Sequence, residues 1–153
     1  MSPRPSADFR TRRVAAIDAG LIPIVCVGES LDERESGRTH EVLKSQFVGG
    51  IAGLNSEQFA KIVIAYEPVW AIGTGKTATP EIAGDAHKSI RSLVAHEFGA
   101  GAAAAVRILY GGSVKADNAA ELLAQPNIDG ALVGGASLDA VGFGKIVEAA
   151  QRA

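Results

Sequence analysis

Residues 64–77 read IAYEPVWAIGTGKT, and this stretch decides the fold class of the chain. A short apolar run ends on Glu67, and a proline-stiffened, glycine-containing segment follows it. In α/β folds active sites form at the carboxyl ends of the strands, so a carboxylate in this place is a candidate general base. A strand-end glutamate that only faces solvent fits the position equally well, and the stretch alone leaves both interpretations open.

The segment after Glu67 is typical of a mobile lid. It includes Gly75-Lys76-Thr77, which resembles the end of a phosphate-binding P-loop. That motif requires a glycine at position 70, where Trp70 stands. The spacing therefore argues against a nucleotide-binding loop.

Short apolar runs bounded by glycine, proline or polar residues recur along the chain. They lie at residues 21–27, 61–66, 106–110 and 128–133. None alternates cleanly, which favours strands buried on both faces of a parallel sheet. Segments with helical spacing separate them, at residues 43–54, from Thr79-Pro80 onward, at 116–124 and at 143–152. Thr79 is a plausible N-cap, followed by proline at the first helical position.

Paired glycines follow two of these runs, at residues 111–112 and 134–135. Glycine lets backbone N–H groups approach a ligand closely at the C-terminal end of a strand, and two such turns side by side suit a phosphate. Glycines that merely permit tight turns are an equally good explanation of the pattern.

Composition excludes several classes of protein. With 153 residues, 47% of them hydrophobic and 21% charged, the chain is the size of one globular domain and is not a disordered tail. The net charge of −2, with no block of Lys or Arg, argues against binding to nucleic acid or anionic membranes. The single cysteine, Cys26, forms no disulfide within the chain, and no Cys/His spacing indicates a metal site. No signal sequence or membrane span is recognisable, so we expect a cytoplasmic protein.

Four motifs in one order resemble the triosephosphate isomerase family. Residues 65–76 carry the strongest match, and the others are CVGE at 26–29, YGGSV at 110–114 and GALVGGAS at 130–137. The resemblance runs from about Val14 to the C-terminus and corresponds to strands five to eight of a (β/α)8 TIM barrel. It implies an α/β fold of four parallel strands alternating with helices, the C-terminal half of such a barrel, over residues 14–153. Residues 1–13 are unmatched, and we expect them to be loose.

The resemblance also implies roles for individual residues. Glu67 matches the base that interconverts D-glyceraldehyde 3-phosphate and dihydroxyacetone phosphate in glycolysis and gluconeogenesis, a reaction that needs no metal and no cofactor. The substrate phosphate would be held by Gly73, Ser113, Gly134 and Gly135. The lid would comprise Pro68, Val69, Trp70, Ala71, Ile72, Gly73, Thr74, Gly75, Lys76, Thr77 and Ala78. Tyr110 and Ser113 match groups that latch the closed lid, whereas Glu29 and Trp70 match a pair associated with the open one.

Two motifs of the family are absent. The family uses a lysine within Asn-x-Lys and a histidine followed by a Ser-Glu-Arg-Arg-like stretch, and neither occurs here. We therefore expect the lone chain to be nearly inactive. The alternatives are a non-catalytic, phosphate-binding half-barrel and a truncated gene product that needs a partner half.

An open half-barrel is also expected to associate. The family is homodimeric, and four strands leave two free edges and an uncovered inner face, which favours self-association or a complementary N-terminal half. Three histidines, His40, His87 and His96, are expected on or near polar helix faces, and Arg91 is expected to pair with Asp129. Lys115 and Lys145 follow strand ends and are expected to be solvated.

Overall fold

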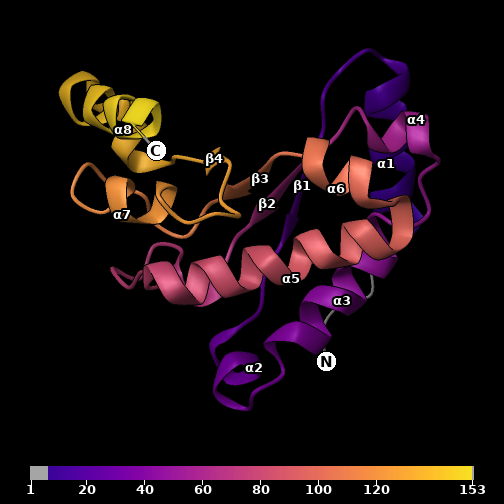
Figure 1. The fold of residues 1–153 in the computed structure, drawn as a ribbon, viewed down its shortest axis with the longest axis horizontal. Helices are drawn as coiled ribbons and strands as arrows, with labels where there is room; N and C mark the ends of the chain where they lie inside the picture. Colours follow the sequence, from indigo (N-terminus) through magenta and orange to yellow (C-terminus); the bar gives the residue numbers. More distant parts are fainter. Residues whose placement is uncertain (1–6, 153) are drawn as a thin grey trace.

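The computed structural model describes residues 7–152, and its elements alternate between helices and strands along most of the chain (Figure 1). In chain order they are α1 (Ala7–Asp18), β1 (Ile24–Val27), α2 (Leu31–Glu35), α3 (Thr39–Gly50), α4 (Ser56–Phe59), β2 (Val63–Tyr66), the 3-10 helix η1 (Val69–Ala71), α5 (Pro80–Phe98), α6 (Ala100–Ala105), β3 (Ile108–Tyr110), α7 (Ala119–Leu123), β4 (Gly130–Ala131), the 3-10 helix η2 (Gly135–Leu138) and α8 (Ala140–Arg152).

The four strands form one parallel sheet in the order β1-β2-β3-β4. One row across it joins Cys26, Ala65, Leu109 and Gly130. This arrangement confirms the predicted α/β fold and is consistent with half of a TIM barrel. The strands are shorter than the apolar runs that predicted them. In β1, β2 and β3 only the carboxyl-terminal part of the run forms the strand, and in β4 only the middle of the run does.

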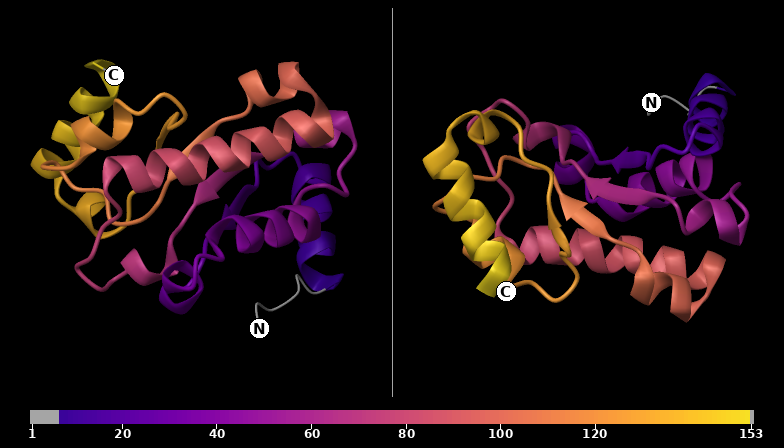
Figure 2. Two further views of the ribbon diagram at one scale, coloured as in Figure 1. Left: turned by 60° about the horizontal axis from the view of Figure 1, so that its bottom comes forward. Right: turned by 90° about the horizontal axis from the view of Figure 1, so that it is seen from above.

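Helices cover one face of the sheet. Helix α3 packs on β1, α5 packs on β3, and the two helices also pack on each other. Their buried side chains include Leu43, Phe47 and Ile90, which meet Ile64 of β2 in the core. Helix α8 lies at the opposite end of the molecule from α1 (Figure 2).

Helix α5 begins where the sequence indicates. The Thr79 side chain accepts a hydrogen bond from the Ile82 N–H at 3.3 Å, and Pro80 occupies the first turn. Toward the other end of this helix Arg91 forms the predicted ion pair with Asp129, at 2.5 Å. Asp129 also accepts from the Ile108 N–H, so the pair ties α5 to the start of β3.

The second face of the sheet is open at its β1 edge. In β1 the side chains of Val25 and Val27 are buried against the helices, whereas Ile24 is 44% exposed and Cys26 is also exposed. Ile22, just before the strand, is 71% exposed. Parallel sheets are normally covered on both faces. The alternation of buried and exposed side chains in β1 is therefore typical of a sheet whose second face packs against further strands, as in a closed barrel.

The N-terminal expectation needs correction. Residues 7–13 are not loose, because they form the first turns of α1, in which Arg13 and Ile17 are buried. Residues 1–6 lie outside the described part of the chain. None of the helices between residues 7 and 152 is long and apolar enough to cross a bilayer.

Candidate active site

Glu67 is held at the carboxyl end of β2 by both neighbouring strands. Its N–H donates to the Val27 carbonyl at 2.8 Å, and the Gly111 N–H donates to the carbonyl of Tyr66 at 2.9 Å. Two glycines make room for it. A Cβ on Gly28 would lie 1.8 Å from the Glu67 carbonyl oxygen, and one on Gly111 would lie 2.7 Å from its Cγ. Both positions therefore require glycine, because Glu67 lies too close to leave room for a Cβ.

Cys26 lies beside the Glu67 carboxylate. Part of the cysteine is open to solvent, yet burial of its sulfur and the nearby Glu67 carboxylate raise its pKa to about 12. At neutral pH the thiol is therefore protonated. The sequence alone did not indicate that a thiol lies this close to the candidate base.

A cavity of about 660 Å³ opens in front of Glu67. Its walls also contain all four residues predicted to bind phosphate, namely Gly73, Ser113, Gly134 and Gly135. Ser113 has φ of 69°, the one left-handed non-glycine conformation among the described residues. Such a conformation is costly and is commonly found at binding sites. Lys115 is the one lysine or arginine in the cavity lining of the described chain.

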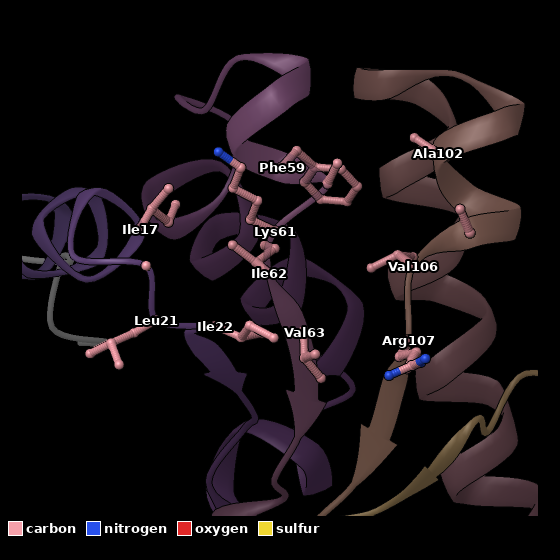
Figure 3. A pocket seen from close by; sticks show the side chains of 13 residues that line it. Ile17, Leu21, Ile22, Phe59, Lys61, Ile62, Val63, Ala102, Val106 and Arg107 are labelled. Atoms are coloured by element: carbon pink, nitrogen blue, oxygen red, sulfur yellow. The ribbon is translucent and has the colours of Figure 1, made fainter.

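A second cavity, of about 580 Å³, lies at the other end of the strands (Figure 3). Apolar side chains such as Phe59, Val63 and Val106 surround it, with Lys61 and Arg107 as its charged residues. Its lining contains no histidine or carboxylate. Among its described lining residues it therefore offers no carboxylate base, and the candidate site is the one that contains Glu67.

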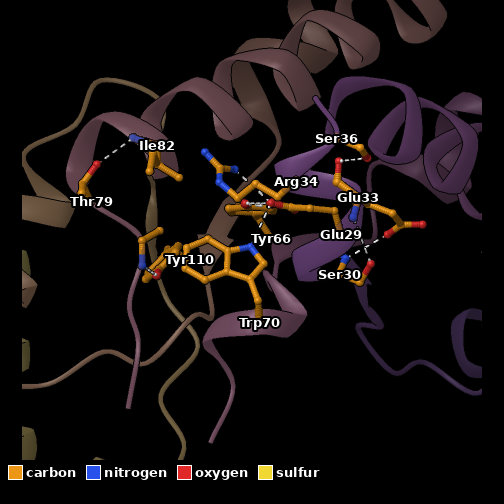
Figure 4. Close-up of polar contacts among 11 residues, drawn as sticks. Glu29, Ser30, Glu33, Arg34, Ser36, Tyr66, Trp70, Thr79, Ile82 and Tyr110 are labelled. Carbon is orange, nitrogen blue, oxygen red and sulfur yellow. Dashed lines mark hydrogen bonds and ion pairs between the residues drawn. The ribbon is translucent and has the colours of Figure 1, made fainter. Parts of the chain in front are cut away.

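The N-terminal part of the predicted lid is attached through Trp70 (Figure 4). Its indole N–H donates to Glu29 at 3.1 Å, and the same buried carboxylate accepts from the Tyr66 hydroxyl at 3.0 Å. Arg34 forms an ion pair with Glu29 at 3.0 Å and lies 5.4 Å from the Trp70 ring centre. Burial, and then the charge of Glu29, raise the pKa of Tyr66, so its hydroxyl remains a donor.

The C-terminal part of the lid is attached to Tyr110. The tyrosine hydroxyl accepts from the Ala78 N–H at 3.1 Å and donates to the Gly112 carbonyl at 2.6 Å. Ser113 Oγ donates to the carbonyl of Ala71, also at 2.6 Å. The resemblance implied that the Tyr110 and Glu29 contacts belong to different lid positions. Here both sets occur together.

His87 departs from the expectation of a polar helix face. The His87 side chain is fully buried, whereas His40 and His96 are exposed as expected. Its Nδ1 lies 3.1 Å from the carbonyl oxygen of Asn127, so Nδ1 carries the proton. The helical period of α5 places position 87 one turn before Ile90, on the buried side, and that spacing was the available signal.

We expect this burial to make stability depend on pH. Burial lowers the pKa of His87 from 6.5 to about 4, with Arg91 acting in the same direction and Asp129 opposing it. Between these values the unfolded chain binds the extra proton, so the free energy of unfolding should fall as pH drops from 6.5, by about 3 kcal/mol in total. Urea unfolding from pH 7 to pH 4 measures this. His87→Phe should flatten the fall and His96→Phe should not; equal profiles would contradict the assignment.

Comparison with known proteins identifies the family of the chain. A protein-family model described as triosephosphate isomerase matches residues 5–150. The chain belongs to the triosephosphate isomerase family. The triosephosphate isomerase of Solibacter usitatus (strain Ellin6076) is 68% identical over 136 residues, which are 89% of this chain and 55% of that protein. That of Geobacter metallireducens is 60% identical over 133 residues, 87% of this chain and 53% of that protein.

The triosephosphate isomerase of Citrifermentans bemidjiense is similarly related, with 56% identity over 133 residues that cover 87% of this chain and 53% of that protein. The chain thus spans about half the length of the curated relatives it matches. Within that span lie the candidate base, the lid and the glycine-rich cavity. Among the described residues no group of three or more His, Cys, Asp and Glu side chains is arranged to hold a metal ion.

Proposed function

We propose that this chain supplies the base, the lid and the phosphate-binding part of a site that interconverts D-glyceraldehyde 3-phosphate and dihydroxyacetone phosphate. One observation carries the proposal: Glu67 lines the same cavity as Gly73, Ser113, Gly134 and Gly135. A carboxylate base and a cluster of backbone N–H groups are the two functions that a triose phosphate requires of this half. A glycolytic substrate and a free cysteine, Cys26, are both in keeping with the cytoplasm.

The chemistry assigned to the chain is a proton transfer. The Glu67 carboxylate takes a proton from one carbon of the triose phosphate and returns it to the neighbouring carbon, so the base ends unchanged. The matching transfer of the hydroxyl proton from one substrate oxygen to the other falls to the group that stabilises the enediolate. Backbone N–H groups around Gly134 hold the phosphate and fix which carbon faces the carboxylate. Closure of the lid excludes water from the intermediate.

The cavity lacks an obvious electrophile for the enediolate. None of the three histidines lines it, and no Asn-x-Lys motif occurs in the chain. We infer that the lone chain is nearly inactive, and that the missing charge stabilisation comes from a complementary N-terminal half. A non-catalytic half-barrel that only binds phosphorylated ligands is the second candidate. It is favoured by a described cavity lining that holds no histidine and has Lys115 as its one cation.

Association follows from the open face of the sheet. The side chains of Ile22 and Ile24 are exposed, and each Å² of apolar surface left in water costs about 25 cal/mol of free energy. We expect the chain to self-associate above its 15.7 kDa monomer when no complementary half is present. Sedimentation should show Ile24→Lys shifting the chain toward monomer, and Val48→Lys, at a 52% exposed site on the outer side of α3, leaving it unchanged. A monodisperse wild-type monomer with a sharp thermal transition and no dye-binding apolar surface would contradict this.

Phosphate binding is expected to depend on Gly134. A Cβ there meets no described atom within 4 Å, so Gly134→Val should place a branched side chain in the cavity and block the N–H groups. The Gly134 backbone, with φ −91° and ψ −114°, lies outside the regions that valine favours, so circular dichroism must first show that the variant is folded. Losing such a hydrogen bond to a charged ligand should weaken phosphoglycolate binding about tenfold or more in a calorimetric titration. Gly53→Val, also in open space but remote from the cavity, is the control. Unchanged affinity in Gly134→Val would place the anion elsewhere, with Lys115 and Lys145 the first residues to test.

A further inference from the structure

Two buried tyrosines hold the two ends of the lid. Tyr66 donates to the Glu29 carboxylate that binds Trp70, and Tyr110 accepts from the Ala78 N–H. Both tyrosines are fully buried, and their ring centres lie 6.2 Å apart. The lid therefore reaches the core through a pair of neighbouring rings.

His87 contacts both of these rings. Its ring centre lies 5.8 Å from that of Tyr66, with the planes at 87°, and 6.3 Å from that of Tyr110. The edge-on contact with Tyr66 is one of the arrangements that aromatic pairs favour. The three rings form a closed triangle, defined here as the Tyr66–His87–Tyr110 cluster.

The orientation of His87 is itself fixed from outside the cluster. The Nδ1–H donates to the Asn127 carbonyl, which also accepts from Arg91 Nη2 at 3.2 Å. Arg91 is in turn held by Asp129. The other ring nitrogen, Nε2, is buried, and no described residue forms a hydrogen bond with it. The His87 ring therefore contacts the two tyrosines through its ring face and edge and not through a hydrogen bond.

We propose that His87 is a positioning residue for the lid, and that it couples the two ends by holding Tyr66 and Tyr110 in place together. The inference rests on the proposed function only in treating residues 68–78 as the lid of a substrate site. The role belongs to the ring and not to a proton transfer, because His87 is absent from the cavity lining. Removing the ring frees both tyrosines to tilt. The Tyr66 hydroxyl then loses its fixed distance to the Glu29 carboxylate that binds Trp70, and the Tyr110 hydroxyl loses its fixed distance to Ala78.

Trp70 reports on this coupling directly. It is the one tryptophan of the chain and lies within the lid, so acrylamide quenching of its fluorescence measures how often the lid is released. This readout needs neither turnover nor phosphate binding. A failure of the proposed isomerase function therefore leaves the test intact, and the two outcomes are distinguishable.

Two substitutions separate the ring from its hydrogen bond. His87→Asn keeps a donor for the Asn127 carbonyl but has no ring, and we expect the released fraction of Trp70 to rise roughly 2- to 10-fold, the shift that loss of aromatic contacts produces. His87→Phe keeps a ring without the donor, and its quenching should stay near that of the wild type. Ile90→Ala removes a buried side chain one turn along α5 and serves as the control for a general loss of core packing.

The comparison is made at a temperature at which circular dichroism shows all variants folded. The proposal is supported if quenching rises in His87→Asn alone. It is overturned if the Trp70 fluorescence of His87→Asn is quenched no more than that of the wild type. It is also overturned if Trp70 in Ile90→Ala or in His87→Phe is quenched as strongly as in His87→Asn.

Discussion

Purified alone, the chain is expected to interconvert triose phosphates almost undetectably, and a separately produced N-terminal half of a triosephosphate isomerase is expected to raise that rate by orders of magnitude. Glu67 can accept a proton, but the resulting enediolate needs charge stabilisation, and the cavity lining of the described chain contains no histidine and has Lys115 as its one cation. Loss of one such donor typically costs about 100- to 1000-fold in rate, and loss of both a lysine and a histidine should cost more. The measurement is the isomerisation rate with and without the added half at matched protein concentration.

The control for this experiment is the base itself. Glu67→Gln should remove most of the restored rate, because an amide does not take up the substrate proton, and Glu67→Asp should do so by withdrawing the carboxylate. Near-native turnover by the lone chain, lost on substitution of Glu67, would contradict the need for the missing groups. The search for a substitute electrophile would then begin with Lys115, which lines the cavity, because none of the three histidines does.

Gly28→Ala is expected to destabilise the fold by about 3 kcal/mol or more, at the upper end of what overpacking costs. The new Cβ would lie 1.8 Å from the backbone oxygen of Glu67, and backbone cannot swing aside as a side chain does. Gly28 has no freedom to retreat, because its N–H and carbonyl are both bonded to the Gln46 side-chain amide, at 2.8 and 2.9 Å. The same clash would move Glu67 away from the cavity.

The matched substitution is Gly101→Ala, in helix α6, where a Cβ meets no atom within 4 Å. Replacing glycine by alanine inside a helix should stabilise by about 0.5–1 kcal/mol. Urea unfolding midpoints decide between these expectations. Equal midpoints for Gly28→Ala and the wild type would mean that the strand ends are looser than the structure shows.

Local signals in the sequence were sufficient to predict much of the fold. Thr79 and Pro80 specify the start of α5 through hydrogen bonding and fixed φ, which depend on neighbouring residues only. The four apolar runs predicted a parallel sheet because continuous apolar character is what burial on both faces requires. The open face of β1 could not be seen in the same pattern, since Ile24 and Cys26 are apolar whether or not anything covers them.

The candidate site was predictable only as far as its backbone. Glu67 and the two glycine pairs follow strand ends, and parallel strands bring their carboxyl ends together, so one cavity was expected. Contacts between side chains from distant elements were not predictable. The closeness of Cys26 to Glu67 depends on the register of β1 and β2, and the contacts of His87 with Tyr66 and Tyr110 depend on how α5 sits on the sheet.

The most direct test of the substrate site is an amide NMR titration of the chain with phosphoglycolate. If Glu67 and the glycine-rich turns form one site, the amide signals of Gly73, Ser113, Gly134 and Gly135 should shift together with that of Glu67, along a single binding curve. Shifts confined to Lys145, or to Lys61 and Arg107 at the opposite cavity, with the signals of these five residues unmoved, would contradict it.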